Sequence, residues 1–198
     1  MASGKPDLHL AQDPDADALL SRDPLALLTG MLLDQQVAME WAFGAPKLLA
    51  DRLGSKRLVA ADIVAHDPEQ FVTLACTPPA IHRYPAAMAR RIQKMCTYLV
   101  EEYDGDAAAV WKDAASGRDL IRRLTALPGF GKQKAQIFTA LLGKQLGVRP
   151  DGWREAAGAY GEDGVRMSVA DILDETTLAE VREYKREQKR AAKAAKGS

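Results

Sequence analysis

The chain has 198 residues, 47% of them hydrophobic and 27% charged, so it can bury the core of one large or two small domains. Basic and acidic residues number 27 each, which excludes a chain that is strongly basic throughout. No apolar run approaches membrane-spanning length, and the polar, acidic start argues against a secretory signal, so we expect a soluble cytoplasmic protein.

Helical signals follow one another along the whole chain. Asp13-Pro14 and Asp23-Pro24 are typical helix starts, with aspartate as N-cap and proline in the first turn. No segment alternates apolar and polar residues over the length of a strand, so the sequence predicts an all-α fold of ten to twelve short helices. The expected helices are 16–21, 25–33, 38–53, 58–64, 68–74, 84–102, 107–112, 118–126, 135–146, 153–160, 168–173 and 176–195.

The ends of the chain differ from its middle. Residues 1–6 are expected to form a loose leader, and residues 7–180 a folded domain. The last segment, 181–198, is predicted to be a basic helical tail, which is either a solvated helix end or an auxiliary contact to nucleic acid.

Cysteine and histidine residues do not have the spacing of metal ligands. Cys76 and Cys96 stand twenty residues apart, as expected of small apolar residues in a reducing compartment. His9, His66 and His82 are well separated from one another, and no metal site is expected. The aromatic residues Trp41, Tyr84 and Trp111 are expected in the core.

The most informative stretch is Leu127-Pro128-Gly129-Phe130-Gly131-Lys132-Gln133-Lys134-Ala135, which lies between two predicted helices. Gly129 and Gly131 allow a tight turn and a close approach of another molecule. The amide groups at the start of the second helix, with Lys132 and Lys134, are suited to a phosphate of a nucleic-acid backbone. An ordinary turn between helices with a glycine stop explains the stretch equally well.

Positive charge is concentrated around this stretch. Residues 118–149 contain seven basic residues and one acidic residue, whereas the first 23 residues carry a net charge of −3. This distribution favours a local phosphate-binding surface. The charged residues of the segment are Arg118, Asp119, Arg122, Arg123, Lys132, Lys134, Lys144 and Arg149.

Asp151 lies 22 residues after Gly129, beyond a break at Gly147 and Pro150. The break allows the chain to reverse and return toward the turn. At the start of the next helix a carboxylate is favoured by the helix dipole, although Asp151 is also a good N-cap.

The helix, Leu-Pro-Gly-Phe-Gly turn, helix and later aspartate together resemble the helix-hairpin-helix superfamily of base-excision DNA glycosylases, in particular its small bacterial members. Leu32-Leu33-Asp34-Gln35-Gln36-Val37 is similar to the family's Leu-x-x-Gln segment. The resemblance spans roughly residues 25–160. It implies two small helical subdomains flanking a cleft, with a hairpin at about 118–146 in a glycosylase-like domain at 7–180.

The resemblance also implies the partner and the chemistry. The expected partner is double-stranded DNA with a lesion or mismatch, bound by a nucleoid-associated monomer through the hairpin residues Gly129, Phe130, Gly131, Lys132 and Lys134. After base flipping, Gln35 or Gln36 would fill the gap; alternatively, they are a hydrogen-bonded pair at a helix end. Asp151 would stabilise the oxocarbenium-like sugar during hydrolysis of the N-glycosidic bond.

The sequence departs from the family at several positions. Gln133 stands where bifunctional members carry the lysine that forms a Schiff base, so a monofunctional enzyme without abasic-site lyase activity is expected. No cysteine follows Cys96, so no iron–sulfur cluster is expected, and a monovalent cation at the hairpin carbonyls is the one ion that the resemblance allows. Trp153 is a weak candidate for the substrate pocket.

Two other functions remain open. The same fold without the chemistry would be a DNA-binding module that recognises distorted duplexes. A helical protein-interaction domain, in which the hairpin is only a turn, is the third.

Overall fold

The computed structural model describes residues 8–196, and every regular element within this range is a helix. The predicted all-α class is therefore confirmed. The predicted leader at 1–6 lies outside the described residues. None of the described helices is long and apolar enough to cross a membrane.

The helices follow the predicted order closely. Their bounds are α1 Pro14–Arg22, α2 Pro24–Leu33, α3 Met39–Arg52, α4 Ala60–Ala65, α5 Pro68–Cys76, α6 Pro85–Tyr103, α7 Ala109–Lys112, α8 Gly117–Ala126, α9 Lys132–Gln145, α10 Trp153–Ala157 and α11 Glu175–Lys196, with single 3₁₀ turns η1 Gly158–Gly161 and η2 Val169–Asp171.

Aspartate side chains start the first helices, as the sequence predicts. The Asp13 carboxylate accepts a hydrogen bond from the Ala16 amide at 2.8 Å. Asp23 accepts from the Leu25 and Ala26 amides at 3.0 and 3.2 Å. Each side chain satisfies amide groups that have no acceptor within the helix, and the proline that follows already has a helical φ angle.

Helix α2 lies at the centre of the molecule, and every residue from Leu25 to Leu33 is buried. It packs mainly against α3, where Gly30 allows close contact, because a Cβ at this position would lie 2.6 Å from Cδ1 of Phe43. A helix that is apolar on all sides can be stable only when other elements surround it.

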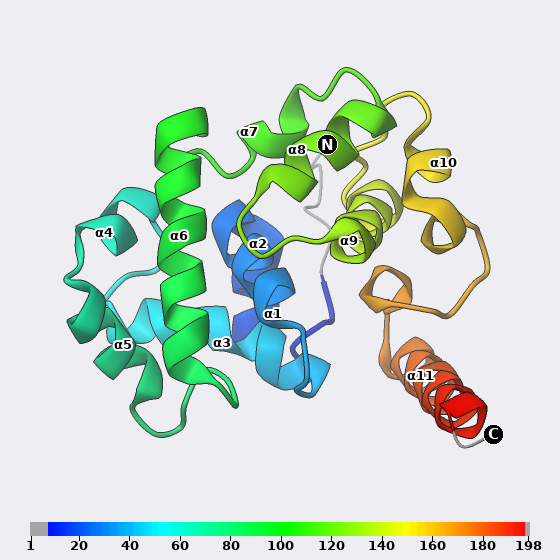
Figure 1. The fold of residues 1–198 in the computed structure, drawn as a ribbon, viewed down its shortest axis with the longest axis horizontal. Helices are drawn as coiled ribbons and strands as arrows, with labels where there is room; N and C mark the ends of the chain where they lie inside the picture. The colour runs from blue at the N-terminus through cyan, green and yellow to red at the C-terminus, as the bar shows by residue number, and fades with distance from the viewer. Residues whose placement is uncertain (1–7, 197–198) are drawn as a thin grey trace.

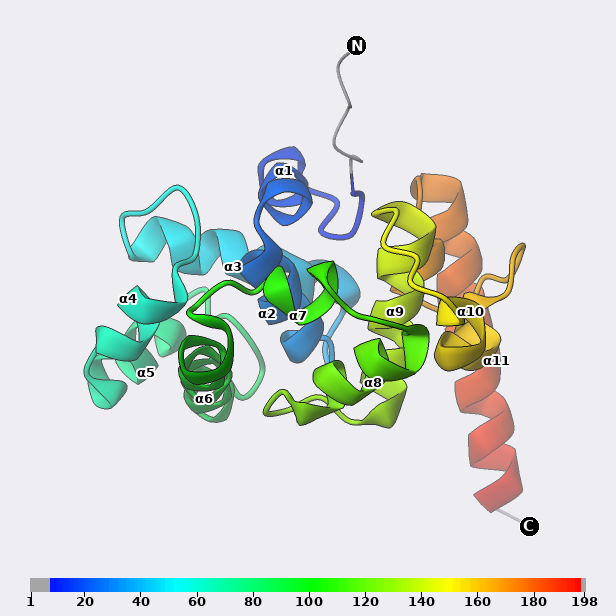
Figure 2. The same cartoon turned by 90° about the horizontal axis from the view of Figure 1, so that it is seen from above.

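The other helices form two groups around α2 (Figure 1). On one side, α4 and α5 pack against α6; on the other, α8, α10 and η2 pack around α9. Helix α11 lies at the outer edge of the second group and extends beyond it at its C-terminal end (Figure 2). Buried hydrophobic residues from both groups belong to one continuous cluster, so the two groups share a core.

Some helix bounds differ from those expected. Helix α9 begins at Lys132, directly after its N-cap Gly131, as the hairpin stretch predicts, although the apolar pattern alone marks only 135–146. The helix expected at 168–173 is only the 3₁₀ turn η2, closed by a capping box of Ser168 and Asp171. The predicted basic tail is the distal part of α11, whose side chains are mostly exposed as far as residue 195.

Candidate nucleic-acid interface

The turn between α8 and α9 is a compact hairpin. The Phe130 amide donates to the Leu127 carbonyl at 3.0 Å, and Gly129 has a φ angle of +90°. A Cβ on Gly129 would lie 2.4 Å from Cδ1 of Leu32, so both the backbone conformation and the packing on α2 require glycine here.

The start of α9 presents amide groups to solvent. Its N-cap Gly131 supplies no side-chain hydrogen bond, and the first amide with a helical acceptor belongs to Ala135, which donates to the Gly131 carbonyl at 3.0 Å. The amides of Lys132, Gln133 and Lys134 therefore point out of the helix end, where the dipole also favours an anion.

Two of the predicted DNA-binding side chains are part of the fold instead. Phe130 is only 4% exposed and packs edge-on against Phe138, with ring centroids 6.1 Å apart. Lys134 Nζ donates to the Met31 and Leu32 carbonyls at 2.6 and 2.9 Å. These contacts satisfy carbonyl groups at the C-terminal end of α2, so the Lys134 ammonium group is not available to a phosphate in this conformation.

Burial also changes the acidity of Lys134. Removal from solvent lowers the pKa of its amine to about 8, although the negative charge of Asp34 acts in the opposite direction. Burial likewise raises the pKa of the half-buried Asp34 carboxyl group, whereas the positive charges of Lys185 and Lys134 act to lower it.

Most of the other basic residues near the hairpin have partners within the protein. Arg122 and Arg123 both pair with Asp119, at 2.5 and 2.9 Å, and Lys144 pairs with Asp171 at 2.6 Å. Arg149 donates to the Gly143 carbonyl at 2.8 Å. Within residues 8–196, Arg118 and Lys132 are the two basic residues of the segment 118–149 that have no hydrogen-bond or ion-pair partner.

Arg118 and Lys132 line the same hollow as Asp151. This hollow, which we call the Asp151 hollow, has a volume of about 830 Å³ and is also lined by Glu155 and Gln136. The exposed Asp151 precedes α10, and its carbonyl accepts a hydrogen bond from the Gly117 amide at 2.7 Å. Asp151 therefore lies at the first residue of α8, the end of that helix away from the turn, and shares a hollow with Lys132 of α9.

Gln35 and Gln36 lie in a different hollow, which we call the α2–α9–α11 cleft. It has a volume of about 620 Å³, and α9 contributes Gln133, Lys134 and Ile137 to it. The cleft and the Asp151 hollow share no lining residue, because Lys132 and Gln136 of α9 face the latter. The structure thus does not bring Asp151 together with the two glutamines.

The two glutamines differ in their surroundings. Gln35 Nε2 donates to the Leu32 carbonyl at 3.3 Å, and the Gln35 carbonyl lies 2.9 Å from Nε2 of the buried His82. Gln36 is exposed, has a φ angle of +58°, and its side chain has no hydrogen-bond partner among the described residues. Left-handed backbone is costly for a residue with a Cβ and is often found at functional sites.

Trp153, the weak pocket candidate, is 7% exposed. Its ring covers α9 at Gly143, where a Cβ would lie 2.3 Å from Cε3, and the Arg154 guanidinium lies 4.6 Å from the ring centre. Trp153 therefore anchors α10 to α9 and is not available for stacking on a base.

The prediction that three other aromatic residues lie in the core is correct only for Trp111, which is 8% exposed. Trp41 and Tyr84 are 43% and 46% exposed, and their ring centroids lie 6.4 and 6.1 Å from that of His82. Trp41 Nε1 donates to the Ala80 carbonyl at 2.9 Å, so a backbone acceptor holds its ring at the surface.

Several residues of the cleft could not be identified from the sequence. Tyr160 accepts a hydrogen bond from Gln133 Nε2 at 2.9 Å, and Tyr184 and Lys185 of α11 complete the wall. Neither a motif nor a regular spacing links them to the hairpin. Asp34, in contrast, immediately precedes the two glutamines in the motif, so its position in the sequence indicated it.

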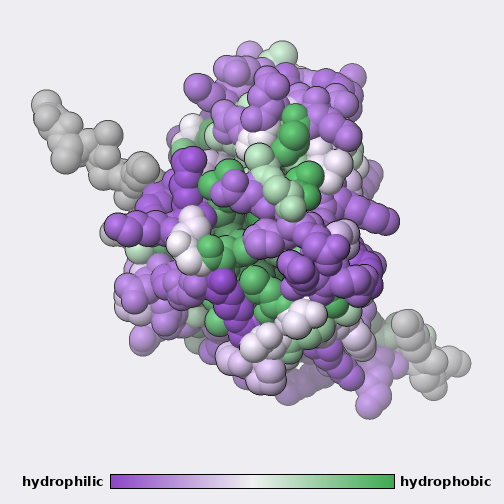
Figure 3. Space-filling model, turned by 90° about the vertical axis from the view of Figure 1, so that its left-hand side faces the viewer, coloured by the Kyte–Doolittle hydropathy of each residue, from purple (hydrophilic) through white to green (hydrophobic). Residues whose placement is uncertain are grey.

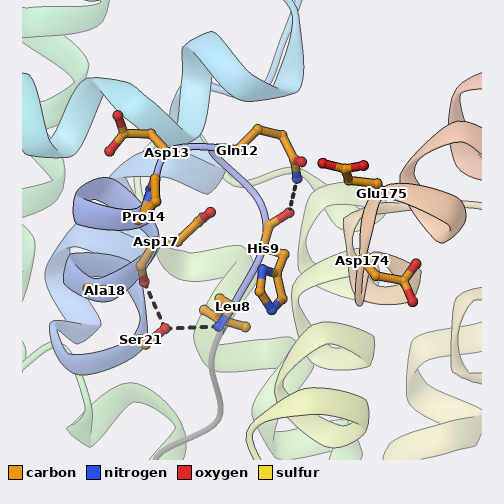
Figure 4. A pocket seen from close by; sticks show the side chains of 10 residues that line it. All are labelled: Leu8, His9, Gln12, Asp13, Pro14, Asp17, Ala18, Ser21, Asp174 and Glu175. Carbon is orange, nitrogen blue, oxygen red and sulfur yellow. Dashed lines mark hydrogen bonds between the residues drawn. The ribbon is translucent and has the colours of Figure 1, made fainter.

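Other surfaces are less suited to nucleic acid. The hollow between α1 and the start of α11 is lined by four carboxylates, Asp13, Asp17, Asp174 and Glu175, which would repel phosphate (Figure 4). On the face of α4 and α5, hydrophobic residues are visible between hydrophilic ones (Figure 3), and Val64 is 37% exposed. Among residues 8–196, no group of three or more His, Cys, Asp or Glu residues could hold a metal ion, and Cys76 and Cys96 are free thiols.

Comparison of the chain with protein-family models, curated proteins and solved structures gave no match.

Proposed function

We propose that this protein is a monofunctional DNA N-glycosylase that removes a damaged or mismatched base by hydrolysis. The observation that carries the proposal is the Asp151 hollow, where this carboxylate lies with Arg118 and Lys132, whose side chains have no partner among the described residues. A glycosylase needs a means of holding the DNA backbone and a negative charge near the sugar, and this hollow supplies both.

The hairpin would hold one phosphate group. The amides at the start of α9 and the exposed Lys132 ammonium offer contacts that do not depend on base sequence. A monovalent cation, if one binds, would be held by the hairpin carbonyls. Among the described residues, Leu127 O accepts one hydrogen bond, from the Phe130 amide, so it retains a lone pair that could hold the cation. The cation would add positive charge next to the phosphate.

Asp151 would act on the sugar. Breaking the N-glycosidic bond creates positive charge on the deoxyribose, which a nearby carboxylate stabilises while water attacks. Gln133 supports hydrolysis without strand cleavage, because a carboxamide cannot form a Schiff base. Of the neighbouring lysines, Lys132 faces the Asp151 hollow and Lys134 is bound to α2 carbonyls.

The test is a panel of duplexes, each with one uracil, hypoxanthine, 8-oxoguanine, alkylated base or mismatch, assayed for abasic sites. Asp151→Asn should bind DNA like the wild type and lose base release. Asp163→Asn is the control, because Asp163 is an exposed aspartate nearby that pairs only with Arg154. Equal excision rates for wild type and Asp151→Asn would remove Asp151 from the mechanism.

The second candidate is a non-catalytic module that recognises distorted duplex DNA. The separation of the two glutamines from Asp151 favours this function. Gln35 and Gln36 line the α2–α9–α11 cleft and Asp151 lines the Asp151 hollow, and the two share no lining residue. Tight, salt-dependent binding to mismatched duplexes without abasic product from any lesion would support this function over the first.

A further inference from the structure

The α2–α9–α11 cleft has a lining suited to a nucleobase. Its polar groups include the carboxamides of Gln35, Gln36, Gln133 and Gln188 and the rings of Tyr160 and Tyr184, and its apolar surface comes from Met31, Val37, Ile137 and Met167. Carboxamides can pair with the hydrogen-bonding edge of a base, and tyrosine and methionine can stack on its face. A volume of about 620 Å³ is typical of a small-molecule site.

Contacts between distant segments form this cleft without a ligand. Gln133 is held by Tyr160, and Lys134 ties the start of α9 to the end of α2. On the opposite side, Arg182 of α11 pairs with Glu40 of α3, and Lys185 Nζ lies 3.3 Å from the Met39 sulfur. The α11 wall of the cleft is therefore fixed to the first half of the chain.

Asp34 is the one carboxyl group among the residues that line the cleft, and its side chain accepts no hydrogen bond from the described residues. The other titratable groups that face the cleft are Lys134 of α9, Tyr160 of η1, and Tyr184 and Lys185 of α11. Burial raises the pKa of Asp34 despite the two lysines, which increases the fraction that carries a proton near neutral pH.

The two hollows lie on different sides of the first turn of α9, with Lys132 facing one and Gln133 the other. A nucleotide whose phosphate binds the amides at this helix end can therefore place its base in the cleft. The Asp151 hollow then lies beside the sugar–phosphate.

We propose that the cleft receives the extruded base and that Asp34 is the general acid that protonates it as it leaves. The inference rests on the proposed glycosylase function. The C1′–N bond breaks, and its electron pair remains on the leaving base. The base takes the carboxyl proton of Asp34. Water adds its oxygen to C1′ and releases a proton that restores Asp34, so the products are a neutral base and an abasic sugar.

This assignment also defines the substrate class. An uncharged base would leave as an anion unless it is protonated, so it gains from an acid in the cleft. A cationic N-alkylated base already leaves as a neutral molecule and needs no such acid. In addition, Lys134 and Lys185 would repel a cationic base. The substrate is therefore an uncharged damaged or mismatched base.

The experiment measures single-turnover excision as a function of pH on duplexes with uncharged lesions (hypoxanthine, uracil, 8-oxoguanine) and cationic lesions (7-methylguanine, 3-methyladenine). The wild type should act on an uncharged lesion, with a rate that falls as rising pH deprotonates Asp34. Asp34→Asn should be about 10²–10⁴-fold slower and lose this pH dependence, and Asp34→Glu should restore part of both. Asp62→Asn, an exposed aspartate on α4, is the control.

A merely structural role for Asp34 would lower the melting temperature and leave the pH profile unchanged, so thermal melts of each variant are measured in parallel. Product from the wild type and from Asp34→Asn at equal rates would overturn the assignment of Asp34 while keeping the glycosylase function. Preference for cationic lesions would overturn the substrate class. Absence of product from the wild type on every duplex would refute the proposed function itself, and with it the role of Asp34 as general acid.

Discussion

The amide of Gly117 donates a hydrogen bond of 2.7 Å to the carbonyl of Asp151. This contact joins the first residue of α8 to the loop that precedes α10, across 34 positions of the chain. A Cβ on Gly117 would lie 2.4 Å from the Gly152 carbonyl oxygen and 2.6 Å from Cα of Trp153. The nearest atoms belong to the backbone, which cannot move aside as a flexible side chain would, so the position of Asp151 depends on this glycine.

Gly117→Ala should therefore decrease the free energy of unfolding by about 1–3 kcal/mol, as expected for an added methyl group in a packed site. It should also reduce base excision, because the Asp151 loop must shift. Urea denaturation measures the first effect. Gly44→Ala is the control: nothing lies within 4 Å of a Cβ in that helical position, and alanine should stabilise α3 by up to about 1 kcal/mol. Equal stability of Gly117→Ala and wild type would contradict the packing described here.

The two lysines of the hairpin should respond differently to substitution. Lys132→Ala should weaken binding to all DNA sequences alike and decrease the slope of log K against log salt by about 1, because one phosphate contact is lost. Lys134→Ala should mainly decrease stability, because the Met31 and Leu32 carbonyls lose their donor. Fluorescence anisotropy at several salt concentrations, with thermal melts, separates the two effects. If the salt slope changed for Lys134→Ala and not for Lys132→Ala, then Lys134 and not Lys132 would be the lysine that contacts a phosphate.

These two lysines also show which features the sequence could predict. The helix starts at Asp13 and Asp23 were predictable because the capping carboxylate and the amides that donate to it lie within three residues of one another. The hairpin was predictable for the same reason. The role of Lys134 was not, because its acceptors lie 102 and 103 residues earlier, at the end of a buried helix.

The cleft, too, depends on contacts between residues that are far apart in the sequence. Gln133 and its partner Tyr160 are 27 residues apart, and Tyr184 and Lys185 reach the cleft only because α11 packs on the first half of the chain. The reversal of the chain at Pro150 was predicted, but the side of α9 on which Asp151 arrives depends on the contact with Gly117. Local patterns therefore identified the hairpin and the carboxylate, and long-range packing decided which residues share a hollow.

The amine of Lys134 should titrate well below the ordinary range of lysine. Burial lowers its pKa to about 8, and Asp34 limits this decrease. After reductive methylation with ¹³C-formaldehyde, the Lys134 signal in an NMR titration should have its midpoint near pH 8. In Asp34→Asn the midpoint should move lower, because a charge that favours the protonated amine is gone. An upward shift in that variant would show that Asp34 does not act on Lys134.

The lowered pKa of Lys134 predicts a dependence of stability on pH. In the unfolded chain lysine titrates near its model value of 10.5, so between about pH 8 and 10.5 the unfolded state binds more protons than the folded state. The contribution of Lys134 to the free energy of unfolding should therefore increase with pH across this window and be constant below it. Lys134→Met should remove the increase, which urea denaturation at pH 7.5 and 10 would detect as a difference between variant and wild type.

The buried ion pair between Lys144 and Asp171 should be more important for stability than any ion pair on the surface. Its atoms are 2.6 Å apart, and the side chains are 13% and 2% exposed. Asp171 also accepts hydrogen bonds from the Met167 and Ser168 amides, so it holds the η2 turn against α9. Lys144→Ala leaves this carboxylate without its counter-ion and should decrease the free energy of unfolding by about 3–5 kcal/mol.

The matched control for this pair is Arg186→Ala. Its pair with Glu183 is on an exposed face of α11, and such pairs contribute less than about 1 kcal/mol. Because η2 leads into α11, loosening of η2 should also displace the Tyr184 and Lys185 wall of the cleft. We therefore expect Lys144→Ala to weaken base excision at temperatures where it is still folded, whereas Arg186→Ala keeps wild-type excision. Normal excision by folded Lys144→Ala would show that the α11 wall is held by its contacts with α3 alone.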